Sequence, residues 1–211
     1  MSPGRRLTLI SVVVGVALGV FSTLADGIIG GRLIGLLGNI AAPWGLAAFF
    51  VGRQTTSPRR GAAAGAVALI VGVATYYLLV AVRGYVFDSV NLVWTVVALV
   101  AGPIVGLCGA ATRAARPPIA AIVTPAAMLV AEALFLFVDR RVWRSSLVAE
   151  PYRLIDVGVM VALFVGGFAL AAWLARGRPH RAVVLLAVAV TGVAGSVAFV
   201  VLRDLIVRIA G

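Results

Sequence analysis

The sequence predicts an all-α, polytopic membrane protein of seven transmembrane helices in a compact bundle with short loops. Of its 211 residues, 63% are hydrophobic, and the mean hydropathy is +1.13. A soluble domain of this size needs far more polar residues to cover its surface. The apolar residues also fall into runs of about twenty, the length of a helix that crosses a bilayer. The breaks between the runs leave no room for a second domain, so we expect residues 1–211 to form one domain.

The charge of the chain points to a membrane surface rather than to nucleic acid. The formal net charge is +11, but the basic residues lie between the apolar runs, where topology and lipid headgroups explain them. All eighteen are Arg, which excludes the lysine Schiff base of retinal proteins and pyridoxal enzymes. Cys108 and His180 are each the only residue of their type. That excludes a disulfide framework, a thiolate metal cluster and a His-based triad, so we expect no metal and no cofactor.

The first predicted span covers residues 7–25. Arg5 and Arg6 precede it, as in a signal peptide, but the run is too long for a typical signal and further spans follow. We therefore expect a retained helix. Gly15 and Gly19 form a small-xxx-small pair, which lets two membrane helices approach closely.

The second predicted span covers residues 33–52, and its sequence is interrupted. Asn39 lies within it, followed by the pair Pro43–Trp44. Proline in a helix interior removes a backbone hydrogen bond and breaks or kinks the helix. If the segment is broken and re-entrant, six spans remain and the orientation of everything after it reverses.

The other five spans follow with short connections. Gly61 and Gly65 open the third span, and Gly102, Gly106 and Gly109 make a smooth packing face on the fourth. The connection at residues 139–153 is the longest loop and carries charges of both signs. The five predicted spans cover residues 61–82, 89–112, 118–138, 154–175 and 182–202.

The distribution of Arg predicts the orientation. One side carries only basic residues, whereas the other mixes Arg with acidic residues, so the positive-inside rule places the first side in the cytoplasm. We expect a cytoplasmic N-terminus and an external C-terminus in a bacterial inner membrane, because the Arg, Ala, Val and Gly bias is typical of GC-rich bacterial genomes. The purely basic side contains Arg5, Arg6, Arg53, Arg59, Arg60, Arg113, Arg116, Arg176, Arg178 and Arg181.

Glu132 is the residue around which the functional prediction is built. It lies in the apolar span 118–138, about 9 Å from the outer end at 1.5 Å per residue. An acid within a span costs about 2.5–3.5 kcal/mol on insertion scales and is a functional candidate by default. Pro125 precedes it by two turns on the same face. Two interpretations stay open: an acid in a pocket, or a buried polar tie between helices.

Polar and aromatic side chains from five predicted spans fall in the same outer layer of the membrane. Groups of this kind must find partners in lipid, which favours an arrangement around one cavity. Each also has a simpler explanation, because Tyr and Trp form aromatic belts and Asn forms hydrogen bonds between helices. With Glu132, the layer contains Asn39, Tyr76, Tyr77, Asn91, Trp94 and Asp156.

An acid in an apolar cavity is a proton donor, and aromatic faces stabilise cations. Together they suit the protonation and cyclisation of an isoprenoid. The chain resembles the bacterial integral-membrane terpene cyclases that act on prenylated natural products. The resemblance is one of architecture over the whole chain: its length, seven spans, minimal loops, no metal motif, and a layer of one acid with Tyr, Trp and Asn.

The resemblance implies a cofactor-independent enzyme that cyclises a farnesyl-type substrate entering from the bilayer. Glu132 would be the proton donor, and Asp26 or Asp156 the second carboxylate. No DDxxD motif is present, so ionisation of a diphosphate by Mg²⁺ is not expected. The aromatic residues would stabilise cations, and the predicted substrate pocket comprises Asn39, Trp44, Tyr76, Tyr77, Asn91, Trp94 and Phe135.

Two other functions stay open. A small-molecule binding or transport component with an outer pocket would be similar to the substrate-capture subunits of vitamin importers. Those subunits usually have six spans, and no repeat relates the two halves of this chain. An assembly or accessory protein would use the polar layer only to tie its helices together. That third function predicts no small-molecule ligand, whereas for the enzyme the expected partners are a lipophilic small-molecule substrate and membrane lipid, with no nucleic acid.

Overall fold

The structure is a computed structural model that describes residues 2–27, 32–84, 89–139 and 152–210. Within these ranges the chain forms helices joined by short turns, and no strand is present. The helices are α1 (Pro3–Gly27), α2 (Arg32–Asn39), α3 (Ala41–Gly52), α4 (Pro58–Val82), α5 (Ser89–Ala111), α6 (Ile119–Asp139), α7 (Tyr152–Leu174) and α8 (Arg181–Ala210).

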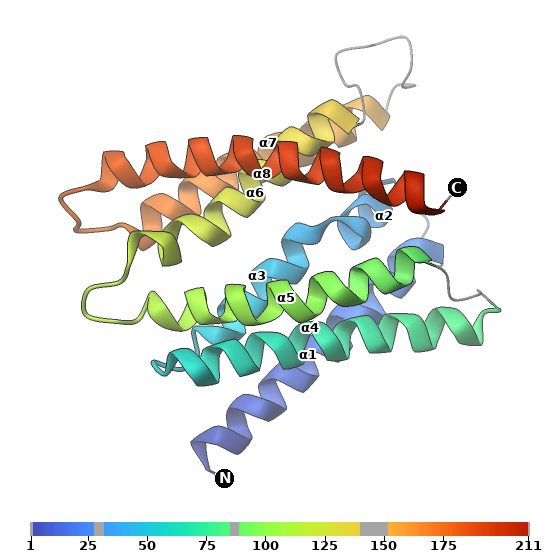
Figure 1. Ribbon diagram of the computed structural model, residues 1–211, viewed down its shortest axis with the longest axis horizontal. Helices are drawn as coiled ribbons and strands as arrows, with labels where there is room; N and C mark the ends of the chain where they lie inside the picture. The colour runs from blue at the N-terminus through green and yellow to red at the C-terminus, as the bar shows by residue number, and fades with distance from the viewer. Residues whose placement is uncertain (1, 28–31, 85–88, 140–151, 211) are drawn as a thin grey trace.

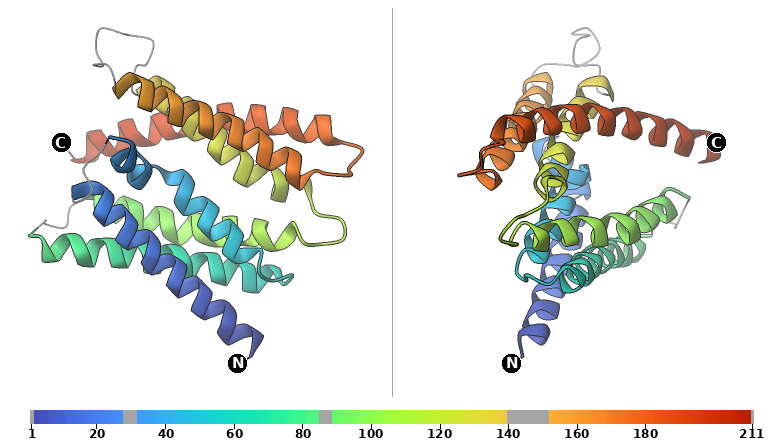
Figure 2. Two further views of the ribbon diagram at one scale, coloured as in Figure 1. Left: turned by 180° about the vertical axis from the view of Figure 1, so that it is seen from behind. Right: turned by 60° about the vertical axis from the view of Figure 1, so that its left-hand side comes forward.

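The helices form two groups with a broken helix between them (Figures 1 and 2). α1, α4 and α5 pack together in one group, and α6 packs with α7 and α8 in the other. α3 contacts α4 and α5 on one side and α6 on the other, while α2 contacts α1 and α7. α6 is the central helix, because 67% of its apolar stretch is buried, against 22–33% for the other long helices. It runs without interruption through Pro125.

Six of the described helices are long and apolar enough to cross a membrane. They correspond to six of the seven predicted spans, which makes the chain an all-helical membrane bundle. The predicted second span, residues 33–52, is not one continuous helix. It is divided into α2 and the short apolar helix α3.

The break falls at Ile40, whose φ of −96° and ψ of 149° are extended. Pro43 explains its position. In a continuous helix the Pro43 ring would collide with the carbonyl of Asn39, four residues earlier, whereas in the first turn of a new helix its missing N–H has no consequence. The predicted interruption is thus confirmed, and α2 is held to the first group because the Ser22 hydroxyl donates to the Gly38 carbonyl at 2.9 Å.

The first group is held by close contact between glycine-bearing faces. A Cβ on Gly19 would lie 2.5 Å from the carbonyl oxygen of Gly72, so only glycine allows α1 to lie this close to α4. Gly65 and Gly106 likewise bring the backbones of α4 and α5 together. The small-residue packing faces predicted on these helices are confirmed.

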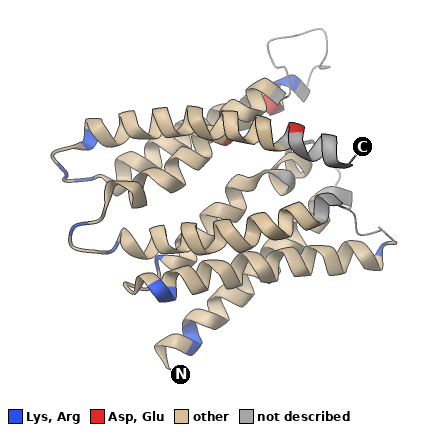
Figure 3. Cartoon of the chain, viewed as in Figure 1, with Lys and Arg blue, Asp and Glu red and all other residues tan. Residues whose placement is uncertain are grey.

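The Arg residues assigned to the cytoplasm gather at one end of the bundle, where α1, α4 and α8 begin and α3, α5 and α7 end (Figure 3). The chain at this end comprises residues 2–6, 53–60, 112–118 and 175–181, all of them described, and it contains no Asp or Glu. We call this region the basic end.

Candidate functional site

Glu132 lies in the interior of the bundle and is only 5% exposed. Both oxygens of its carboxylate accept hydrogen bonds from the backbone of α3. The N–H of Ala41 donates to Oε1 at 2.8 Å, and the N–H of Ala42 donates to Oε2 at 2.5 Å. The acid of α6 therefore caps the first turn of α3.

The sequence of α3 explains why this cap comes from another helix. The first N–H groups of any helix lack partners within it, and Ser, Thr, Asp or Asn usually supplies one. Here the N-cap residue is Ile40, whose side chain makes no such bond. Pro43 has no N–H, so the two donors of Ala41 and Ala42 are those that need an acceptor. The partial positive charge at a helix N-terminus also favours a carboxylate.

Aliphatic side chains enclose this contact. A buried cluster around it includes Leu36, Ile40 and Ala42 from the broken helix and Leu129 and Leu136 from α6. In such a low-dielectric environment each hydrogen bond is strong, and an unpaired polar group is costly. The polar tie between helices, one of the two interpretations of Glu132, is thus what the structure shows.

The other two predicted carboxylates lie on different helices. Asp156 is in the first turns of α7 and is 3% exposed. Asp26 is in the last turn of α1, and its side chain lies outside the described residues.

The predicted aromatic residues are dispersed over several contacts. Trp44 packs on α4, where a Cβ on Gly72 would lie 2.7 Å from its ring. Tyr76 and Tyr77 form an edge-to-face pair with centroids 5.5 Å apart. Phe135 pairs with Phe199 of α8 at 5.6 Å.

The remaining predicted residues lie on α2 and α5. Trp94 of α5 is 42% exposed on the outside of the helix bundle. Asn39 ends α2 and Asn91 is in the first turn of α5, and their side chains lie outside the described residues.

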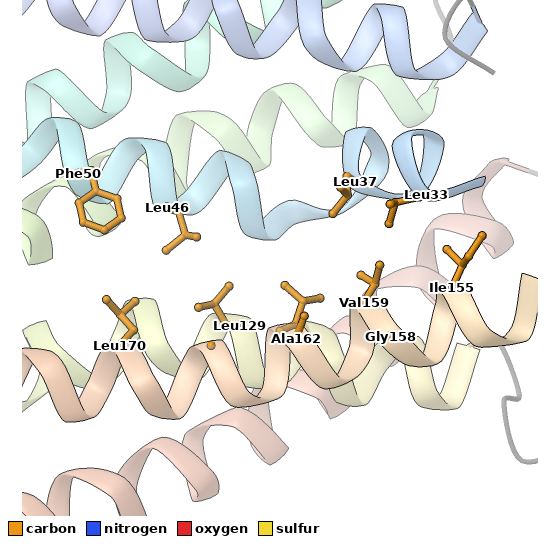
Figure 4. Close-up of a pocket in the computed structure, with 12 residues that line it drawn as sticks. Leu33, Leu37, Leu46, Phe50, Leu129, Ile155, Gly158, Val159, Ala162 and Leu170 are labelled. Atoms are coloured by element: carbon orange, nitrogen blue, oxygen red, sulfur yellow. The ribbon is translucent and has the colours of Figure 1, made fainter. Parts of the chain in front are cut away.

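A groove of about 680 Å³ lies between the broken helix and α7 (Figure 4). Side chains of α2 and α3 point across it toward α7, and Leu129 of α6 also reaches it. We call it the α3–α7 groove. It is lined by Leu33, Leu37, Leu46, Phe50, Leu129, Ile155, Gly158, Val159, Ala162, Leu163, Gly166 and Leu170.

None of the residues predicted for the substrate pocket is among these lining residues. Leu, Ala and Gly in a membrane span cannot be told from core by composition, which is why the sequence did not reveal the groove. One signal was available. Gly158, Ala162 and Gly166 repeat at every fourth residue and form a small-residue stripe on α7. A Cβ on Gly158 or Gly166 would meet no atom within 4 Å, so the stripe is not used for close helix packing.

The arrangement separates two tasks. Glu132 holds the first turn of α3, which carries one wall of the groove, and both of its oxygens are engaged. The groove itself presents only apolar side chains and therefore binds by shape. Its volume falls within the range of about 300–1,000 Å³ that is typical of small-molecule sites.

The chain belongs to a family of unknown function, DUF6518, which it matches over residues 2–205. No curated protein and no solved structure matches it.

Proposed function

We propose that this member of DUF6518 is a membrane protein that binds a lipid-soluble molecule in the α3–α7 groove. The observation that carries the proposal is the groove itself, an apolar space of about 680 Å³ beside an unpacked stripe of small residues. Helix-packing motifs of this kind usually bring a second helix into contact. Here the opposite wall consists of large side chains, so the space stays open for a ligand.

The proposal includes seven crossings, with α2 and α3 together forming the second. α2 packs on the C-terminal part of α1, since a Cβ on Gly38 would meet Ala25 and Ser22. α3 ends beside the start of α4, since Gly52 and Gly61 both pack on Gly106. A broken helix within the membrane needs partners for the freed backbone groups, and Glu132 supplies them.

Seven crossings place the two termini on opposite sides of the membrane. With the basic end in the cytoplasm of a bacterium, the N-terminus is inside and the C-terminus outside. In a Cys108→Ala background, Gly4→Cys and Asp204→Cys place one thiol near each terminus. An impermeant thiol reagent added to intact cells should label Asp204→Cys alone. Labelling of both or of neither would show an even number of crossings.

Selectivity in this groove rests on shape rather than on the hydrophobic effect. A ligand that arrives from the bilayer is already out of water, so its transfer gains little from apolar burial. What favours the bound molecule over the same molecule free in the bilayer is the number of close contacts, each worth about 0.1–0.2 kcal/mol. Small residues at Gly158, Ala162 and Gly166 set that shape.

The binding proposal is tested with Gly166→Leu, which fills the groove, and Val165→Leu as its matched control. Val165 is the neighbouring residue and is 58% exposed on the outside of α7. Each variant is purified in mild detergent, and co-purifying compounds are identified by mass spectrometry. We expect a compound retained by the wild type and Val165→Leu and lost from Gly166→Leu. Equal retention in all three would contradict the proposal.

A terpene cyclase is the second candidate, and one observation favours it. Glu132 follows the groove residue Leu129 by one helical turn on α6, so a buried acid lies close to the space where a substrate would bind. To act as a proton donor, however, the acid would have to release a bond to the first turn of α3. Cyclisation predicts a product isomeric with a fed prenylated substrate, made by the wild type and absent in Glu132→Gln with folding intact. Loss of folding instead assigns Glu132 to structure.

A further inference from the structure

One end of the α3–α7 groove leads to a basic and an aromatic residue that lie just beyond its apolar lining. Phe50 and Leu170 line the groove where α3 and α7 approach the basic end (Figure 4). About one turn beyond them are Arg53, which caps the C-terminus of α3, and Trp173 of α7. The Cζ atom of Arg53 lies 4.4 Å from the centroid of the Trp173 ring, which places a cation over an aromatic face. The apolar groove thus leads directly to a positive charge.

A second guanidinium group approaches Arg53. Nη1 of Arg113, just after α5, donates to the carbonyl oxygen of Arg53 at 3.3 Å. Burial, and then the charge of Arg113, lower the pKa of the Arg53 guanidinium below its usual range. Since the basic end contains no Asp or Glu, nothing on the chain there compensates these two charges.

Arg53 also has an unused donor. Among the described residues, its Nε is shielded from solvent and has no hydrogen-bond partner. A buried donor without a partner costs free energy, which makes Arg53 an unusual residue of the basic end. An acceptor with negative charge would compensate the two guanidinium groups together.

We propose that the α3–α7 groove and the Arg53–Arg113–Trp173 cluster together bind an anionic phospholipid, with one acyl chain in the groove and the headgroup phosphate on the two Arg side chains. This inference rests on the binding function proposed above and names its ligand class. The groove extends along α7 from Ile155 to Leu170, about 22 Å at 1.5 Å per residue, which suits an extended chain.

The position of the cluster favours a lipid phosphate over a soluble anion. Trp173 is 39% exposed at the end of a span, the depth at which Trp contacts headgroups. Arg suits phosphate because its planar group donates two parallel hydrogen bonds. Arg178 adds a third guanidinium group to the basic end, in the connection after α7, where its Nη1 donates to the carbonyl of Pro117 at 3.2 Å.

The test is a titration of purified protein with phosphatidylglycerol or phosphatidylcholine, followed by native mass spectrometry. We expect the wild type to prefer the anionic lipid by about tenfold, and Arg53→Gln and Arg113→Gln each to reduce that preference to about twofold. Arg60→Gln is the matched control, because it removes an equal charge at the basic end but lies on α4 beside α1. Melting temperatures in phosphatidylcholine verify that each variant is folded.

Three outcomes overturn the inference. An equal loss of preference in Arg60→Gln would show a general effect of surface charge. Unchanged preference in Arg53→Gln and Arg113→Gln would show that the cluster does not bind the headgroup. Displacement of the lipid by millimolar inorganic phosphate would identify a soluble anion as the ligand.

Gly166→Leu distinguishes this inference from the binding function on which it rests. If the groove holds the acyl chain, Gly166→Leu weakens the binding of both lipids about equally, whereas the Arg variants weaken only the binding of the anionic lipid. Gly166→Leu could instead leave the affinity for both lipids unchanged while the Arg variants abolish the preference for the anionic lipid. The groove proposal then fails, and the Arg cluster contacts only the headgroup.

Discussion

Two faces of this molecule carry the same small-residue pattern and pack in opposite ways. Between α4 and α5, Gly61 and Gly65 meet Gly102 and Gly106, and the two backbones touch. On α7, Gly158, Ala162 and Gly166 recur at the same spacing, and a Cβ on either glycine would meet nothing. The difference lies in the opposite helix. α5 presents glycines of its own, whereas α2 and α3 present leucines and a phenylalanine that keep α7 at a distance.

A stripe of small residues allows the close approach of two helices but does not cause it. Contact follows when both helices present small residues, because only then do the backbones come within van der Waals distance. When one wall is large and the other small, a groove of ligand size is left. The side chains on the opposite helix, not the stripe itself, therefore decide between helix packing and an open groove.

The largest effect is expected from a large side chain at the α4–α5 contact. Gly106→Leu would drive side-chain atoms into the backbone of α4 at Gly61 and Gly65. Overpacking of this kind costs typically about 1–3 kcal/mol and more where backbone is displaced. We expect the variant to lose most of its folded fraction in a thermal-unfolding assay in detergent. A melting temperature equal to that of the wild type would contradict the close contact.

The next effect in size concerns Glu132. In Glu132→Gln one oxygen still accepts a backbone bond, but the amide NH₂ then faces the second N–H of the first turn of α3. A buried unpaired donor costs about 1–3 kcal/mol. We expect a lower melting temperature and faster hydrogen exchange at Ala41 and Ala42. Asp204→Asn, at an exposed acid of α8, is the control, and equal stability of both variants would refute the capping role.

The smallest expected effect is the most informative about the groove. A Cβ at position 166 would meet no atom within 4 Å. In a helix interior, leucine is more favourable than glycine by up to about 1 kcal/mol. The melting temperature should therefore stay the same or rise slightly, in contrast to Gly106→Leu. A clear loss of stability would show that the α7 stripe is a packed interface after all.

Much of the fold could be predicted from the sequence because the membrane imposes simple rules. Length and hydropathy identified the six long helices, Gly15 and Gly19 identified a close-packing face on α1, and Asn39 and Pro43 identified the break in the second span. The predicted second span, residues 33–52, is not a continuous helix, and the residue that breaks it is the proline on which the prediction of an interruption rested. Pro43 cannot continue a helix through the Asn39 carbonyl.

The candidate site was harder to predict. Glu132 was recognised as exceptional, but its partners are backbone N–H groups about 90 residues away in the chain. They become available only where the helix breaks and only when α6 lies beside that break. No property of the Glu132 sequence neighbourhood encodes this contact. The groove was missed because every residue in it is of a type that also fills a core.

Binding of an acyl chain in the α3–α7 groove can be measured by photo-crosslinking with a phospholipid that carries a diazirine on its acyl chain, followed by peptide mapping. If the α3–α7 groove binds an acyl chain, crosslinks concentrate on α7 between Ile155 and Leu170 and on Leu46 and Phe50 of α3, and Gly166→Leu removes them. If labelling instead follows exposure alone, so that outward residues of α8 such as Val190 and Val197 are marked as strongly and Gly166→Leu changes nothing, the account is contradicted.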